Sequence, residues 1–292
     1  MATLRQIRRR IRSIQNTAKI TKAMELVAAS KMRRAQARAL AARPYAEKVR
    51  WMLADLVESL QSAGAEALHP LLEQRDAKKV GIVLVTPDRG LCGGLNANVN
   101  RYAAAFALEQ RSRGLEVLMV SVGRKGRDFF ARAGYPLAAE FTRLGDYPSY
   151  EDTRPIARLL MDEYVTGQLD RVYLAYPLFI NTVTQRPQVQ QLLPVEPPEK
   201  GSPESVDYIY EPSARAVLAE LLPRYVEMQV YHVVLELSAS EQSARMVAMR
   251  NATDAATDMI QDLSLSYNKA RQEQITKELL DIVGGVAGLV KS

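Results

Sequence analysis

The loop DRGLCGGLN, Asp88 to Asn96, is the stretch of this sequence that comes nearest to a phosphate-binding or catalytic motif. It follows an apolar run and opens a helical pattern, which is a place where backbone N–H groups can converge on an anion. The loop lacks the Gly-Lys-Ser/Thr ending of a P-loop and does not match G-x-G-x-x-G. We therefore favour tight packing of strand against helix through Gly90, Gly93 and Gly94 over phosphate binding.

Cys92, in the same loop, is the only cysteine of the chain. A nucleophilic cysteine needs a neighbouring base, and the two histidines are His69, in an apparent loop, and His232, in a distant helical pattern. We expect Cys92 to be a buried, small apolar residue. One cysteine excludes an internal disulfide, and together with two histidines it gives no metal-ligating spacing. The sequence thus predicts no catalytic residue, no cofactor and no metal.

Three short apolar runs in the middle of the chain have the length and composition of buried strands. These runs are Lys78–Thr86, Leu115–Gly123 and Asp170–Tyr176. Helical patterns accompany them at Leu95–Arg113, Lys125–Ala133 and Glu151–Thr166. Alternating strands and helices predict a small Rossmann-like α/β domain over residues 76–200, with a largely parallel sheet. The proline-rich stretch Pro194–Pro203 then leads into another helical segment.

The N-terminal segment carries an apolar repeat of 3.5 residues, which is typical of a coiled-coil seam. All but two of its positions hold small or apolar side chains, and the full set is Leu4, Ile7, Ile11, Ile14, Ala18, Thr21, Glu25, Ala28, Met32, Ala35, Ala39, Ala42, Ala46, Val49, Leu53, Leu56 and Leu60. Thr21 and Glu25 are the two exceptions. We expect Pro44 to kink this helix or to disturb one turn, because proline lacks a backbone N–H.

A second repeat of the same kind fills the C-terminal segment from Leu218 to Ala270. After Gln274 its phase slips by one residue, and it continues through Ile275, Leu279, Ile282, Val286 and Leu289. Two long heptad segments in one chain are most simply paired as an antiparallel coiled coil. The predicted fold class is α/β with long helices, in which residues 1–62 and 211–292 form one shaft beside the α/β domain.

The net charge of +6 conceals a strong asymmetry. Residues 1–50 hold fourteen lysines and arginines against two carboxylates, whereas the rest of the chain holds twenty-five cations and thirty-one anions. The basicity therefore belongs to the N-terminal segment, which should seek an acidic partner. No run of about 18 apolar residues occurs, so we expect no membrane-spanning helix.

Several interpretations of this basic segment compete. A mitochondrial presequence has a similar excess of arginine, but its cleavage would destroy the seam. A nucleic-acid-binding arm has the charge, although no aromatic residue precedes Tyr45. A solvated basic face explains the charge alone. A helix enclosed by acidic protein surfaces explains both the charge and the seam.

The run IQNTAKITKAMELVAASKMRRAQ, with RPYAE just beyond it, closely resembles the N-terminal helix of the gamma subunit of rotary, proton-translocating (F-type) ATP synthases. The resemblance continues in VTPDRGLCGGLN, FINTVTQ, QQLLP and DYIYEP. It ends with LSASEQSARMVAMRNATDAA and LSYNKARQEQITKELLDIVGGVAGL. These motifs follow the family's order and cover essentially the whole chain.

The resemblance implies the central rotor shaft of an F-type ATP synthase. Such a shaft couples proton-driven rotation of the membrane c ring to conformational cycling of the catalytic beta subunits, and it regulates ATPase activity and proton flow. The implied partners are three alpha and three beta subunits, the epsilon subunit and the c-subunit ring, with no nucleic acid. The chain itself is then non-catalytic and peripheral, at the cytoplasmic face of the bacterial plasma membrane rather than at the mitochondrial inner membrane.

The resemblance also implies roles for individual residues. The positions that match the family's contacts with beta are Met24, Arg245, Gln272, Thr276 and Glu278. The positions that match the foot facing the c ring are Tyr208 and Tyr210. Two other functions are carried as alternatives: a nucleic-acid-associated coiled-coil protein with an α/β head, and an α/β enzyme that uses the Cys92 loop. Salt-dependent DNA affinity would favour the first, and turnover by the isolated chain would favour the second.

Overall fold

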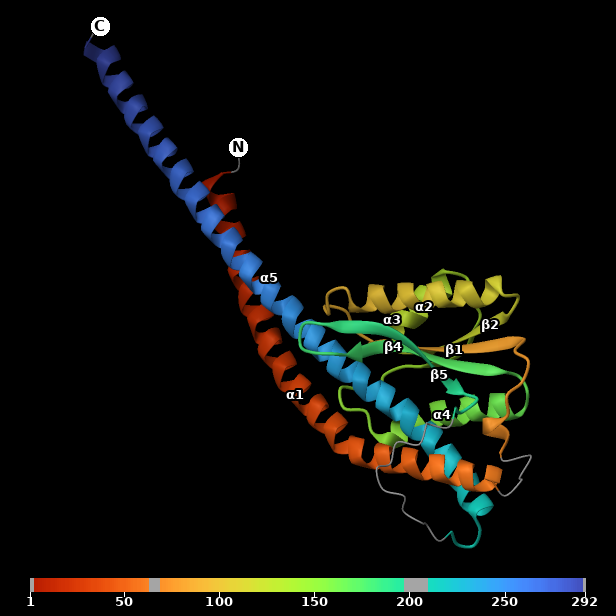
Figure 1. The fold of residues 1–292 in the computed structure, drawn as a ribbon. Coiled ribbons are helices and arrows are strands. Elements are labelled where there is room, and N and C mark those ends of the chain that lie inside the picture. The colour runs from red at the N-terminus through yellow and green to blue at the C-terminus, as the bar shows by residue number, and fades with distance from the viewer. Residues whose placement is uncertain (1–2, 63–68, 197–209, 291–292) are drawn as a thin grey trace. The chain divides into compact units, whose positions relative to one another are not determined.

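Two long helices and a five-stranded sheet make up the described chain (Figure 1). The computed structural model describes residues 3–62, 69–196 and 210–290, with the side chains of residues 40, 42, 43, 46, 281 and 284–290 outside the description. The chain divides into a two-helix unit, Met1–Val27 with Met246–Ser292, and a sheet unit, Ala28–Arg245. The long helices α1 (Leu4–Ser62) and α5 (Ala214–Val290) contribute to both units.

Between the long helices the elements alternate in the predicted way. Their bounds are η1 (Pro70–Leu72), β1 (Lys79–Val85), α2 (Leu95–Ser112), β2 (Glu116–Val122), α3 (Arg124–Arg132), β3 (Leu137–Phe141), α4 (Tyr150–Val165), β4 (Arg171–Phe179) and β5 (Gln185–Leu193). The strand order is β3-β2-β1-β4-β5, with parallel pairing throughout except for the antiparallel pair β4 and β5. The predicted fold class, α/β with long helices, is confirmed.

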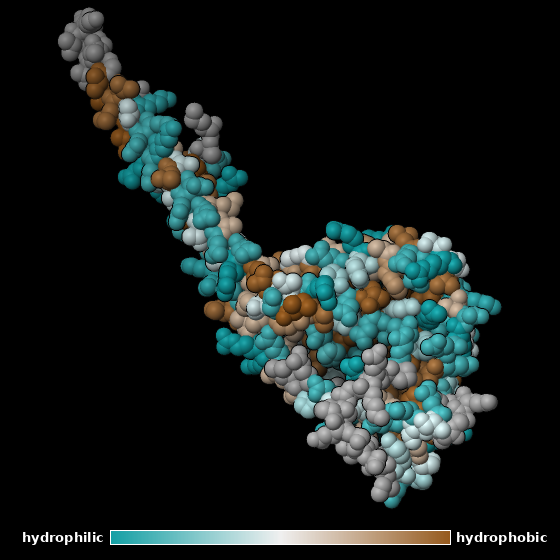
Figure 2. Space-filling view, viewed as in Figure 1, coloured by the Kyte–Doolittle hydropathy of each residue, from teal (hydrophilic) through white to brown (hydrophobic). Residues whose placement is uncertain are grey.

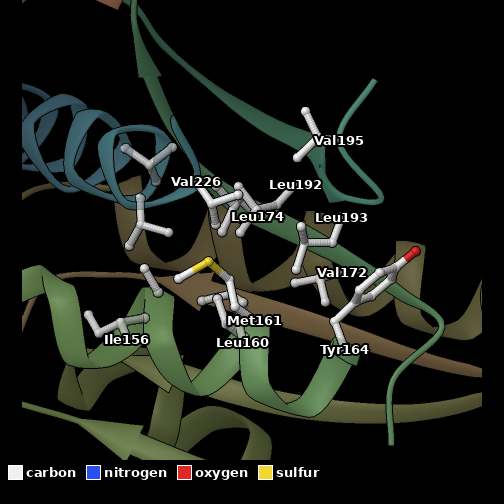
Figure 3. Packing of buried hydrophobic residues seen from close by; sticks show 14 of the residues in the cluster. Ile156, Leu160, Met161, Tyr164, Val172, Leu174, Leu192, Leu193, Val195 and Val226 are labelled. Carbon is white, nitrogen blue, oxygen red and sulfur yellow. The ribbon is translucent and has the colours of Figure 1, made fainter. Parts of the chain in front are cut away.

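The sheet is the middle layer of three (Figure 1). Alternate residues of β1 point to opposite faces: Ile82 packs with α2 and α3, whereas Val83 packs with α4, α1 and α5. Figure 3 shows this second core, in which the α4 side chains Leu160 and Tyr164 meet side chains of β4, β5 and α5. The apolar repeat of α1 ends in this core, where Leu53 and Leu56 are fully buried. Residues 28–62 of α1 therefore belong to the sheet unit.

Two of the strands, β3 and β5, were not predicted from the sequence. β3 is short and alanine-rich, and β5, with the sequence QRPQVQQLL, is rich in glutamine and carries Pro187. Both are edge strands, and an edge strand can accept a proline because one row of its N–H groups has no partner in the sheet. The prediction also ended β4 at Tyr176, three residues before its end at Phe179.

Pro44 does not end α1, which continues as a helix on both sides of it. The axis of α1 changes direction in the orange stretch that contains this proline (Figure 1). The missing N–H of proline accounts for a bend of this kind. The predicted division into residues 1–62, 76–200 and 211–292 stays a prediction.

Candidate coupling surface

The two-helix unit is an antiparallel pair, as the heptads predict. Its register is set by contacts that join Arg8 to Tyr267, Thr21 to Thr253 and Glu25 to Arg250. Residue numbers on α5 decrease as those of their partners on α1 increase, so the two helices run antiparallel. Small side chains let the helices approach closely, and Ala256 is one of the buried seam residues.

The two exceptions in the α1 seam form a polar layer between the helices. The hydroxyl groups of Thr21 and Thr253 lie 2.7 Å apart. Glu25 is only 5% exposed and accepts hydrogen bonds from Lys22 at 2.9 Å and from Arg250 at 3.2 Å. The hydrogen bond from Lys22, helped by Arg250, lowers the pKa of Glu25 below its ordinary value of 4.5, although burial opposes this shift. In the sequence, Thr21 and Glu25 are exceptions to the apolar repeat. Polar residues at seam positions can fix the register of two paired helices, and these two have that role here.

Met24 lies beside this layer, on the border between seam and surface, and is half-buried. All seven lysines and arginines among residues 3–27 are exposed, and these are Arg5, Arg8, Arg9, Arg10, Arg12, Lys19 and Lys22. One carboxylate, the buried Glu25, accompanies them on α1 within this range. The described part of α1 in this unit therefore presents a cationic surface.

Gln272, Thr276 and Glu278 are exposed on the C-terminal part of α5. The Thr276 hydroxyl donates to the Gln272 carbonyl oxygen at 2.9 Å, a bond within the same helix. The register places Leu4, the first residue of α1, opposite about residue 271 of α5, so these three residues have no α1 residue opposite them. They therefore lie on a single helix.

The predicted continuation of the seam past Gln274 is not buried in the described chain. Ile275, Leu279 and Ile282 are 45%, 57% and 64% exposed, because α1 begins too late to cover them. Figure 2 shows hydrophobic residues, in brown, along this stretch of α5. The side chains of Val286 and Leu289 lie outside the described residues.

Arg245, in the sheet unit, is bound within the chain. Its Nη2 atom donates to Glu241 at 2.6 Å and to the Gly90 carbonyl oxygen at 3.2 Å, and its side chain is 11% exposed. Burial raises the pKa of Glu241, and the neighbouring Arg245 opposes this effect. Arg245 therefore attaches the loop after β1 to α5, a contact that the sequence did not predict.

The loop from Asp88 to Asn96 differs in part from its prediction. Cys92 is buried, as expected, and burial raises the pKa of its thiol. Gly93 has a positive φ of 57°, which suits glycine. A Cβ on Gly90 or Gly94 would meet nothing closer than 3.4 Å, so the prediction of tight packing at these two glycines is wrong.

The tight approach occurs at Gly123 instead, directly after β2. Its φ is +92°, and a Cβ there would lie 1.8 Å from the Thr86 carbonyl oxygen. Asp88 fixes the neighbouring loops by accepting from the backbone N–H groups of Arg124 and Arg143, each at 2.9 Å. A cavity of about 40 Å³ beside them has room for a few water molecules at most.

The predicted foot residues are only partly described. Tyr208 lies outside the described residues. Tyr210 is half-buried and packs against the core formed by α1, α4 and α5. Within the described ranges, no three His, Cys, Asp or Glu side chains gather as a metal site. No described helix has both the length and the apolar character needed to cross a membrane.

Comparison with known proteins gives consistent matches. The family described as ATP synthase matches residues 3–289. The ATP synthase gamma chain of Dehalococcoides mccartyi is 57% identical over 289 residues, which cover 99% of this chain and 100% of that protein. The gamma chain of Chloroflexus aurantiacus is 52% identical over 290 residues, covering 99% of each.

Solved structures share the fold. A chain from the central stalk and c ring of the Tetrahymena thermophila mitochondrial ATP synthase matches with a TM-score of 0.62 at 28% identity, over 80% of this chain and 99% of that one. A chain from the Euglena gracilis mitochondrial ATP synthase matches with a TM-score of 0.67 at 21% identity, over 98% and 94%.

Proposed function

The chain belongs to the gamma chains of the ATP synthase family, and from this premise we propose that it is the central rotor shaft of an F-type ATP synthase. The observation that carries the proposal is the antiparallel pair of α1 and α5, found in a chain that matches gamma chains over their full length. In the seam of the pair Ile7, Met249 and Ala256 are buried and most other apolar residues are half-buried, whereas the cations of α1 within residues 3–27 are exposed. A shaft needs this arrangement, because it must hold its own shape while other subunits slide past it.

The cationic surface of α1 is the part of the shaft that we propose to face carboxylates of the beta subunits. Exposed ion pairs are weak and depend on position, with typical values of about 0–1 kcal/mol. Contacts of that strength can form in one rotary position and break in the next without trapping the rotor. We place Met24 on this surface, beside the buried Glu25.

Gln272, Thr276 and Glu278 supply the second contact with beta. They stand on a single helix that α1 does not cover, so their side chains are free to meet another subunit. Rotation of an off-centre helix changes which subunit it approaches, and this change would drive the beta sites through different states. Arg245 acts in part through the loop that it holds, which carries the exposed Leu91.

The remaining partners follow from the same role. We propose three alpha and three beta subunits around the shaft, and the epsilon subunit and the c ring at the foot that holds Tyr208 and Tyr210. ATP chemistry then belongs to beta, and this chain is non-catalytic, works without a cofactor and regulates ATPase activity and proton flow. The complex would place it at the cytoplasmic face of a bacterial plasma membrane, peripherally.

Reconstitution tests this function. Alpha and beta subunits co-expressed with this chain should copurify with it, and vesicles containing the whole complex should acidify when ATP is added. Complexes assembled without the chain should hydrolyse ATP but pump no protons. Pumping that does not depend on the chain would refute the rotor role, and micromolar binding of Mg-ATP by the chain alone would refute its non-catalytic role.

A further inference from the structure

A stripe of buried polar side chains on α5 has no part in the function proposed so far. Glu236, Ser240 and Ser243 stand at positions i, i+4 and i+7, so they lie on one face of the helix. They are 7%, 0% and 0% exposed. Burial of a carboxylate and two hydroxyl groups is costly unless each of them is hydrogen-bonded.

Each of the three side chains bonds to the backbone of the β4–β5 hairpin. Glu236 Oε2 accepts from the Phe179 N–H at 3.0 Å. The serine hydroxyls donate to carbonyl oxygens, Ser240 to Pro177 at 3.0 Å and Ser243 to Thr182 at 2.7 Å. The helix therefore binds three main-chain groups of the hairpin, and one hairpin side chain adds to them, because Gln185 Nε2 donates to Ser243 Oγ at 3.5 Å.

The hairpin has unpaired backbone groups at this point because β4 is longer than its neighbour β1. The last parallel pair joins Leu84 of β1 to Ala175, and β4 continues to Phe179. Pro177 and Phe179 are two residues apart, so their backbone groups lie on the same edge of the strand. Buried backbone groups must be paired, and α5 supplies the partners that β1 does not.

Two more bonds continue this attachment to other loops of the sheet unit. Ser238 Oγ lies 3.5 Å from the Asp146 carbonyl oxygen, and Arg245 donates to the Gly90 carbonyl oxygen. Residues 236–245 of α5 thus bond to three separate loops. The next residue along the helix, Met246, begins the two-helix unit.

We propose that the hydrogen bonds of Glu236, Ser240 and Ser243 to the hairpin backbone form a lock that transmits torque between α5 and the sheet. This proposal rests on the rotor function above. Apolar packing opposes large rotations of α5, which would expose its buried side chains, but the hydrophobic effect is non-directional and fixes the angle of the helix less sharply than hydrogen bonds do. Hydrogen bonds are directional, and all three would break together if α5 turned against the hairpin. The lock therefore fixes the rotation of α5 about its own axis as well as its position on the hairpin.

Amide hydrogen exchange tests the lock directly in the assembled complex. Glu236→Leu removes the acceptor, so exchange at the Phe179 amide should accelerate at least tenfold, whereas Glu236→Gln keeps an acceptor oxygen and should retain protection. Ser240→Ala with Ser243→Ala provides a second variant should Glu236→Leu fail to fold. Ser264→Ala is the matched control, because within the described residues the Ser264 hydroxyl bonds to the Ile260 carbonyl oxygen of its own helix and to no other element. The serine variant keeps the acceptor of the Phe179 amide, so its loss of two donors should accelerate exchange there by a smaller factor, through a looser hairpin. Unchanged exchange in Glu236→Leu, or in the serine variant where Glu236→Leu does not fold, would overturn the proposal.

ATP-driven proton pumping and ATPase rate, measured on the same vesicles, test the torque role. The lock variants should lose at least half of the protons pumped per ATP hydrolysed, at normal assembly, whereas Glu236→Gln and Ser264→Ala should retain the wild-type ratio. An unchanged ratio in the lock variants would show that the stripe stabilises the fold without bearing torque. Failure of wild-type vesicles to pump would instead refute the rotor function.

Discussion

The two units use polar side chains of α5 in different ways. In the sheet unit, Glu236 and Ser240 of α5 bond to the backbone of a strand that is itself part of a three-layer core. In the two-helix unit, Thr253 and Arg250 of α5 bond to side chains of one other helix. A backbone partner is fixed by the whole sheet, whereas a side-chain partner can rotate away. The part of α5 in the sheet unit is therefore anchored to a fixed backbone, whereas its part in the two-helix unit is paired through side chains.

This difference agrees with the demands of a rotor. The sheet unit must carry torque as a rigid body, and its core joins the two faces of the sheet to five helices. The paired helices must be slender, and their contact follows one seam, in which the polar layer of Thr21 and Glu25 interrupts small and apolar residues. Substitutions should therefore have their largest effects in the sheet unit and smaller effects in the two-helix unit.

The largest effect is expected for Gly123→Ala in the sheet unit. The new Cβ would lie 1.8 Å from the Thr86 carbonyl oxygen, at a φ that disfavours alanine. We expect a loss of about 4 kcal/mol or more in the free energy of unfolding, measured by urea denaturation of the chain. Gly114→Ala is the matched control, since its φ is +82° but nothing lies within 4 Å, and it should cost about 1–2 kcal/mol. Equal losses would show that the close approach is unimportant.

The second effect concerns the neighbouring residues Ala255 and Ala256 of the two-helix unit. Ala256 is 5% exposed in the seam, whereas Ala255 is exposed. Ala256→Leu should force the helices apart and cost about 1–3 kcal/mol. Ala255→Leu should change stability by less than about 0.5 kcal/mol. Amide exchange of residues 246–270 measures both, and equal protection in the two variants would mean that the seam tolerates large side chains.

The third effect depends on pH. The folded state lowers the pKa of Glu25, so the folded chain binds this proton more weakly than the unfolded chain. The stabilisation is therefore present above the ordinary pKa of 4.5, and it is lost as the pH falls from there through the folded pKa. The protection factors of the amides of residues 18–27, which compare each exchange rate with its intrinsic rate at the same pH, should fall on acidification, and Glu25→Gln should reduce that fall. An identical pH profile for the variant would contradict the polar layer.

The smallest effect on stability is expected for Gln272→Ala and Thr276→Ala. Both residues are exposed on the single-helix part of α5, so each change should alter the free energy of unfolding of the chain by less than about 0.5 kcal/mol. ATP turnover of the assembled complex should nevertheless fall, because these side chains are proposed to contact beta. Normal turnover would remove them from the coupling surface, and a loss of assembly would give them a structural role.

Elements with a local, periodic signal could be predicted from the order of the amino acids alone. The 3.5-residue repeats predicted α1, α5 and their pairing, and valine-rich runs predicted β1, β2 and β4. A periodic apolar face must be buried, so its spacing reveals the element whatever its partner is. The resemblance of motifs from IQNTAKITKAME to the C-terminal helix supplied the family, and with it the candidate residues.

The long-range partners of the polar side chains, by contrast, became known from the assembled fold. Glu25 and Thr21 appeared to interrupt the seam, Arg245 appeared free for another subunit, and the glutamine-rich β5 carried no strand signal. Several of these hydrogen bonds join residues that are distant in sequence, such as Glu236 and Phe179. The spacing of residues in one segment does not reveal which other segment it will contact. The end of β4 beyond β1 created the unpaired backbone groups that α5 binds, and strand lengths and register become known only when the sheet is assembled.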